Sequence, residues 1–254
     1  MSEEKPETFL SHLVELRQRL VRAAIAVGVV FVGLFPFANK IYDLVAYPMI
    51  SVLPAGTKMI ATGVITPFMV PLKVAALVAF VIALPVVLYQ AWAFIAPGLY
   101  EYEKKLVLPL VVMSWLLFLI GIAFCYFFVF GTVFRFVQSW APESINVAPD
   151  IEQYLSFVLS MFLAFGVTFE VPVVVIVLVR ARIVTIEQLK SFRSYFIVAA
   201  FVIAAVVTPP DVVSQLLLAI PLCILYEVGI LLARFVQKRV VPPQAPAETE
   251  TPAP

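Results

Sequence analysis

The stretch LVLPLVVMSWLLFLIGIAFCYFFVF, residues Leu106–Phe130, has 25 positions and no charged side chain. An α-helix rises ~1.5 Å per residue, so about 20 apolar residues are enough to cross the hydrocarbon core of a bilayer. The stretch exceeds this length, and it predicts a helix that spans a membrane.

The composition of the whole chain gives the same indication. Of the 254 residues, 63% are apolar and 13% are charged, whereas soluble domains average ~45–50% apolar and ~25% charged residues. The mean hydropathy is +1.06. We therefore expect an all-α polytopic membrane protein, and we exclude a cytosolic enzyme, a disordered chain and a secreted disulfide scaffold. The formal net charge of +1 gives no basic field that would suggest a nucleic-acid partner.

Six apolar runs along the chain predict six membrane spans. The first follows from an N-terminal helix expected at about residues 8–21, and the fifth is short but ends at the helix-breaking pair Pro209 and Pro210. The expected spans are about 20–38, 68–96, 106–131, 154–179, 194–208 and 212–232. Residues 1–233 then form one membrane domain, and the proline-rich residues 234–254 are expected to be a disordered cytoplasmic tail.

The basic residues are distributed unevenly between the two sides of these spans. Alternating the loops places 13 Lys and Arg residues on the side of both termini and three on the other side. Because the cytoplasmic loops of membrane proteins carry the excess of Lys and Arg, the N-terminus and the C-terminus are both expected in the cytoplasm.

Proline and alanine positions suggest the shape of the bundle. Interior prolines kink helices, so several of them favour a concave wall, although prolines are also common in membrane helices generally. Apolar residues near helical spacing between Asn39 and Pro67 predict a helical cap on the outer face. Alanine faces on spans two and five allow close approach of a helix, either from the same bundle or from a single-span partner. The prolines are Pro85, Pro97, Pro109, Pro172 and Pro221, and the alanine faces contain Ala75, Ala79, Ala83, Ala200 and Ala204.

Glu170 is the most costly polar residue, because it interrupts the apolar fourth span. A carboxylate at membrane depth costs a few kcal/mol or more unless it is neutralised or used. Glu170 either faces a polar groove, with Gln215 at similar depth, or forms an interhelical hydrogen bond that joins spans four and six. Asp211 precedes the sixth span and is expected to cap its N-terminus.

Motifs of catalysis and of metal or nucleotide binding are absent from the sequence. It has no GxSxG, no HExxH and no GxxxxGK[ST], and its sole histidine is His12, outside the predicted bundle. We therefore expect no enzyme activity, no cofactor and no metal, and the predicted function is transport or recognition.

Two carboxylates on the predicted cytoplasmic side suggest a ligand with guanidinium groups. Glu15 lies in HLVELRQRL, four residues before Arg19, and Glu103 lies in the loop GLYEYEKKL. Such residues are often solvated surface charges, but a planar guanidinium binds a carboxylate through two parallel hydrogen bonds.

Four stretches of the chain resemble the TatC family, the multi-spanning receptor subunit of the twin-arginine, Sec-independent protein translocase. They are HLVELRQRL (His12–Leu20), LPVVLYQAWAFIAPGLYEYEKK (Leu84–Lys105), FGVTFEVPVV (Phe165–Val174) and TPPDVVSQLLLAIPLCILYE (Thr208–Glu227).

The resemblance implies a receptor in the bacterial inner membrane that binds the twin-arginine signal peptides of folded proteins and helps to assemble the site of export, driven by the proton gradient. It implies that Glu103 pairs with a signal arginine, with Glu15, Arg17 and Phe94 in the same site, and that Pro48 supports the outer cap. It further implies that Glu170 and Gln215 line a groove for an apolar segment.

The implied partners are single-span TatA- and TatB-like subunits against spans five and six, and further copies of the chain. The alternative function from the residues alone is a proton-coupled small-molecule transporter built around Glu170.

Overall fold

The computed structural model describes residues 9–51, 53, 58–95, 107–140, 142, 148–208 and 211–240. Within these residues all regular secondary structure is helical, apart from an isolated parallel β-bridge between Ile60 and Asp150. The expectation of an all-α membrane protein is confirmed. The elements are α1 (Phe9–Leu34), the 3-10 turn η1 (Phe35–Phe37), α2 (Ala38–Ile50), α3 (Thr66–Ile95), α4 (Val107–Phe124), the π-helical turn η4 (Cys125–Val129), α5 (Phe130–Trp140), α6 (Ile151–Phe169), α7 (Val171–Arg180), α8 (Ile186–Ser191), α9 (Arg193–Val207) and α10 (Val212–Val240).

Five helical stretches within the described residues are long and apolar enough to cross a membrane. The sixth apolar helix, α9, has 15 residues, which corresponds to ~22 Å at the rise of an α-helix. The fifth apolar run is therefore helical and short, as expected from the sequence; its role as a membrane span stays a prediction. The five longer stretches are Leu13–Ile50, Thr66–Phe94, Leu108–Trp140, Ile151–Arg180 and Val212–Phe235.

The C-terminal helix is longer than expected. The tail was expected to begin at residue 234, but α10 continues through Val240. The apolar stretch GILLARFV keeps the helix going, since no proline follows until Pro242. Residues 241–254, the remainder of the expected tail, lie outside the described part.

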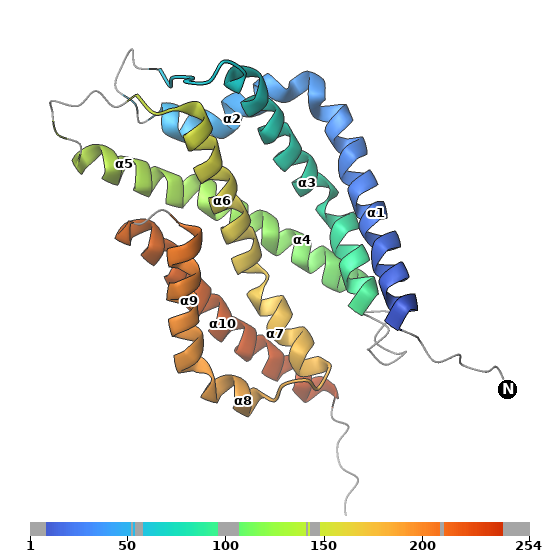
Figure 1. The fold of residues 1–254 in the computed structure, drawn as a ribbon. Coiled ribbons are helices and arrows are strands. Elements are labelled where there is room, and N and C mark those ends of the chain that lie inside the picture. Colours follow the sequence, from blue (N-terminus) through green and yellow to red (C-terminus); the bar gives the residue numbers. More distant parts are fainter. Residues whose placement is uncertain are drawn as a thin grey trace, which may run out of the picture.

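The helices form an irregular bundle (Figure 1). α1 packs on α3, α4 packs on both α3 and α6, and α10 packs on α7 and α9. α2 lies across one end of the bundle, and the short α8 lies at the opposite end. We call these the cap end and the α8 end.

Proline interrupts the helices at several of the expected places. Pro85 lies inside α3 and Pro221 inside α10. Near Pro172 the helix breaks: α6 ends at Phe169, Glu170 occupies a turn, and α7 begins at Val171. Because proline suits the first turn of a helix and not its interior, the fourth span consists of two helices joined at Glu170.

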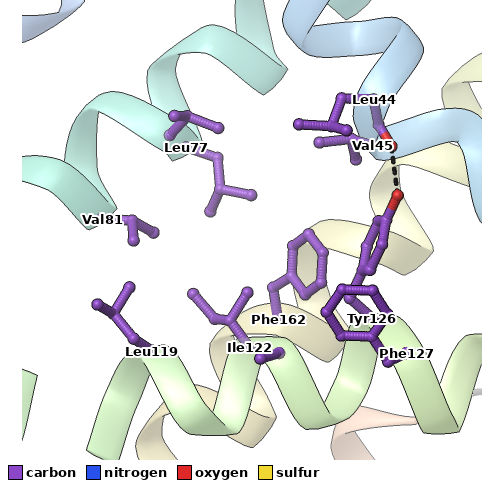
Figure 2. Close-up of a pocket in the computed structure, with 11 residues that line it drawn as sticks. Leu44, Val45, Leu77, Val81, Leu119, Ile122, Tyr126, Phe127 and Phe162 are labelled. Carbon is purple, nitrogen blue, oxygen red and sulfur yellow. Dashed lines mark hydrogen bonds between the residues drawn. The ribbon is translucent and has the colours of Figure 1, made fainter. Parts of the chain in front are cut away.

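Two tyrosines attach α2 to the bundle. Pro48 lies inside α2 and has no N–H, so the Leu44 carbonyl four residues earlier loses its usual helical donor. The Tyr126 hydroxyl, from the π-turn η4, donates to that carbonyl at 2.7 Å (Figure 2). The Tyr154 hydroxyl of α6 donates to the next carbonyl, that of Val45, at 3.0 Å. The cap helix is thereby fixed to the third and fourth spans.

Two apolar clusters hold the described helices together. The larger one joins the cap end to the middle of the bundle and is rich in aromatic rings, with Phe130 and Phe165 fully buried. The smaller one seats α8 against α7 and α10, and it contains Val175, Ile186, Leu189, Tyr226, Ile230 and Ala233.

Candidate functional site

Glu15 is already engaged by an arginine of its own helix. Arg19 donates to Glu15 Oε1 from Nε at 2.8 Å and from Nη2 at 2.5 Å. Both hydrogen bonds go to the same carboxylate oxygen, and the Glu15 side chain is about one third exposed (34%). The Glu15 carboxylate is therefore shared with Arg19 and still partly exposed.

Arg17 and Phe94 lie at the same end of the bundle as Glu15. Arg17 is exposed on α1, next to the Glu15–Arg19 pair, and Phe94 is half-buried one residue before the end of α3. α1 begins and α3 ends at the α8 end, where the two helices run side by side (Figure 1). Glu103, the carboxylate that was expected to bind a signal arginine, lies outside the described residues.

Glu170 is half-buried at the break between α6 and α7. The fully buried Ser114 hydroxyl of α4 approaches its carboxyl group, but neither Ser114 Oγ nor Glu170 Oε1 completes a hydrogen bond of good geometry. The polar neighbour of Glu170 that the structure shows therefore comes from span three.

Gln215 makes a hydrogen bond to α9: its Nε2 donates to the Phe201 carbonyl at 3.2 Å. Leu218, three residues further along α10, lines the same groove as Thr168 and Val171, which flank Glu170 in sequence. That Gln215 and Glu170 lie at similar depth along one groove stays a prediction.

A groove of about 580 Å³ lies between α6 and α7 on one side and α9 and α10 on the other. Thr168 and Val171, which flank Glu170 closely in sequence, line it. The remaining lining residues are Ser160, Leu163, Ala164, Val167, Phe196, Ile203, Val206, Val207, Leu218 and Leu222.

Asp211 caps α10 as expected. Its Oδ1 accepts a hydrogen bond from the Ser214 backbone amide at 2.7 Å, which satisfies one of the free N–H groups of the first turn. This prediction is confirmed. Near the middle of the same helix, Glu227 forms an ion pair of 2.6 Å with Arg193, which ties α9 to α10.

A polar cluster at the cap end was not anticipated. Asp150 accepts from the Thr62 hydroxyl at 2.7 Å and from the Thr62 amide at 3.1 Å, and its other oxygen caps α6. These bonds, the one from the Thr62 hydroxyl foremost, hold the pKa of Asp150 below its ordinary value. Next to it, Glu152 accepts from Lys73 Nζ at 3.0 Å and from the Thr66 hydroxyl at 3.2 Å. We call these five residues the cap-end clamp.

The sequence contained a local signal for two residues, Ser114 and Asp150, that the sequence analysis did not identify. Ser114 is the one serine or threonine in the apolar run Leu106–Phe130, and Asp150 precedes α6 as an N-cap residue. Their partners are 56 (170 − 114) and 88 (150 − 62) residues away, so no local pattern identifies them. Among the described residues no cluster of His, Cys, Asp and Glu has a metal-binding arrangement.

Comparisons with known proteins place this arrangement in a family. The family model "Sec-independent protein translocase protein (TatC)" matches residues 11–221. A TatC of Halothiobacillus neapolitanus is 52% identical over 242 residues, which cover 95% of this chain and 66% of the relative, so the chain spans slightly under two thirds of that protein. The TatC of Escherichia coli K12 is 51% identical over 235 residues, which cover 92% of this chain and 91% of the relative.

A solved structure shares the fold. The crystal structure of a protein described as the twin arginine translocase receptor TatC superposes with a TM-score of 0.77 at 41% sequence identity, covering 89% of this chain and 99% of that chain. The family model and the curated relatives extend over most of the sequence, and the helical architecture agrees with the solved fold. The chain is a member of the TatC family of Sec-independent protein translocase proteins.

Proposed function

We propose that this chain is the receptor subunit of a twin-arginine protein translocase, which binds the signal peptides of folded cargo and organises their export. The observation that carries the proposal is the similarity, over nearly the whole chain, to the solved twin arginine translocase receptor. The relatives compared are protein translocase components, which favours this function over a small-molecule transporter built around Glu170.

The binding site for the arginines is proposed at the α8 end. Glu103 supplies one carboxylate, Glu15 supplies a second, and Arg17 and Phe94 complete the site. The partial exposure of the Glu15 side chain and the position of Phe94 one residue before the end of α3 support this assignment. A signal arginine would displace or share the bonds that Arg19 makes to Glu15, since both guanidinium groups need the same acceptor.

The α8 end is proposed to face the cytoplasm of a bacterium, with the chain in the inner membrane and both termini inside. Several basic residues gather at or near the α8 end, including Arg17, Arg19, Arg22, Arg180, Arg182, Lys190, Arg193 and Arg234. The excess of positive charge supports a cytoplasmic location for this end.

The groove between α6, α7, α9 and α10 is proposed to receive an apolar helix, from the signal peptide or from a TatA- or TatB-like single-span subunit. Its lining is almost entirely aliphatic and aromatic, which suits an apolar helix. The short α9, with Ala200 and Ala204 buried and its other face exposed, offers a second surface for such a subunit. Self-association of the chain is part of the same proposal.

Site-specific photo-crosslinking in inverted membrane vesicles tests the receptor assignment. The probe is a signal peptide with Arg-Arg, and the control peptide carries Lys-Lys, which keeps the charge and loses the planar fork. The proposal requires a crosslink near Glu15 and Glu103 that depends on Arg-Arg. Glu103→Gln should weaken it, and the matched variant Glu101→Gln, two residues away in the same loop, should not. Equal crosslinking of both peptides would contradict the carboxylate assignment.

A further inference from the structure

A second cavity, of about 330 Å³, lies beneath the cap helix and is separate from the groove described above. Figure 2 shows side chains from α2, α3, α4, η4 and α6 arranged around it. The residues that line it are Leu44, Val45, Leu77, Val78, Val81, Leu119, Ile122, Ala123, Tyr126, Phe127 and Phe162. Its residues come from three membrane-spanning stretches and the helix across their end, so it lies beside the hydrocarbon of the bilayer.

The cavity offers no hydrogen bond to a polar ligand. Tyr126 is the one lining residue with a polar side chain, and its hydroxyl is used by the Leu44 carbonyl at 2.7 Å (Figure 2). The other lining side chains are aliphatic or aromatic. A ligand held here therefore presents an apolar surface.

The cavity is open at its side, because two of the residues that line it, Leu44 and Phe127, are largely exposed. A hydrocarbon chain of the surrounding bilayer can therefore enter it without any separation of the helices.

The Lys40 ammonium group lies on the same face of the cap helix α2 as Leu44, which lines the cavity. Lys40 lies four residues before Leu44, so the two side chains share one face of α2. Both are exposed, and no carboxylate among the described residues pairs with Lys40. α2 crosses the end of the spans (Figure 1), where the phosphate groups of a bilayer lie.

From these observations we infer that the cavity beneath the cap binds one acyl chain of a membrane phospholipid, whose phosphate group contacts Lys40. The bound chain fills the space between α2, α3 and η4. This site is independent of the signal-peptide receptor function.

Native mass spectrometry of the purified chain, delipidated in detergent and titrated with dioleoyl phosphatidylglycerol, tests the site. Ala123→Phe and, on the opposite wall, Val78→Phe place a ring in the cavity. Each should lower the ratio of singly lipid-bound to free protein about tenfold, since two or more buried methylenes are displaced. The matched control is Ala205→Phe, at an exposed alanine of α9 outside both cavities, and it should keep the wild-type ratio.

The phosphate contact is tested with Lys40→Gln and with dioleoylglycerol, which lacks the phosphate. Lys40→Gln should weaken the phospholipid severalfold and leave dioleoylglycerol unchanged. If both filling variants fold, as judged by their circular dichroism, and bind lipid like Ala205→Phe, the site is overturned. If Lys40→Gln binds both lipids like the wild type, the headgroup assignment is overturned. A photoreactive residue at Leu119 that crosslinks to a protein in membranes would also contradict an acyl chain as occupant.

Discussion

The Tyr126 hydroxyl lies 2.7 Å from the carbonyl oxygen of Leu44, the one carbonyl of α2 that Pro48 deprives of its helical amide donor. A side chain from the third span thus replaces a backbone group of the cap helix. The two residues are 82 positions apart in the sequence, so this hydrogen bond joins the cap to the bundle while it completes the helix.

Tyr126→Phe should destabilise the protein by about 1–2 kcal/mol, because it leaves the Leu44 carbonyl without a donor. In a Pro48→Ala background the same change should cost clearly less, since the amide of the new alanine can donate to Leu44. Thermal unfolding of the four proteins in detergent measures this coupling. An equal cost of Tyr126→Phe in both backgrounds would show that Tyr126 does not replace the missing amide.

Arg182→Gly should stabilise the fold by about 1 kcal/mol, because an L-residue other than glycine is strained in the left-handed region. Arg182 has φ = 55° and ends α7 in a Schellman motif, with Ile183 N–H donating to Leu178 C=O at 3.1 Å and Arg182 N–H to Val179 C=O at 3.1 Å. Arg182→Ala removes the same charge and keeps the strain, so only the glycine variant should show a raised Tm. A raised Tm in both variants would show that the loss of the Arg182 charge, and not the relief of backbone strain, stabilises the protein.

Gly121→Ala should destabilise the bundle by about 1–3 kcal/mol, the usual cost of overpacking. A Cβ atom at this position would lie 2.6 Å from the Phe165 backbone oxygen, so α4 and α6 would have to separate. Gly33→Ala is the matched control, because a Cβ atom there meets nothing within 4 Å. It should be neutral or stabilising by up to ~1 kcal/mol, through helix propensity. Chemical denaturation in detergent compares the two, and an equal effect at both sites would refute the close approach.

Asp150→Asn should remove a stabilising contribution that depends on pH. The hydrogen bonds from Thr62 and from the first turn of α6 lower the pKa of Asp150 in the folded state. A group of this kind stabilises fully above its unfolded pKa of about 3.9 and loses that contribution as pH falls through the folded value.

The wild type should therefore have a higher Tm than the Asp150→Asn variant near neutral pH, and the difference should shrink below about pH 4. Glu187→Gln, at the α8 end and away from the clamp, serves as the control. A Tm difference between wild type and Asp150→Asn that stays constant as the pH is lowered from neutral to about 3 would count against the carboxylate's role.

Arg19→Gln should strengthen binding of an Arg-Arg signal peptide about two- to fivefold, because a surface ion pair worth up to ~1 kcal/mol no longer competes for Glu15. Arg22→Gln removes the same charge one turn further along α1 without touching Glu15, and it should change the affinity less. Fluorescence titration of labelled peptide into vesicles measures both. A loss of affinity in Arg19→Gln would place Arg19 as a supporting residue of the site and reject the competition.

The sequence by itself determined the membrane class, the helical spans, the short fifth helix and the Asp211 cap, because apolar run length, proline breaks and capping residues act within a few neighbouring positions. Only the tertiary structure decided which polar groups meet. Ser114 lies near Glu170, whereas Gln215 donates to the Phe201 carbonyl, and these pairings depend on how far each helix is shifted along its neighbours. The π-turn at Cys125–Val129 adds a residue to a turn and changes the face that later side chains present, so no regular period predicts that Tyr126 reaches Leu44. Pairings across about 50 or more residues arise from packing, which a local pattern does not encode.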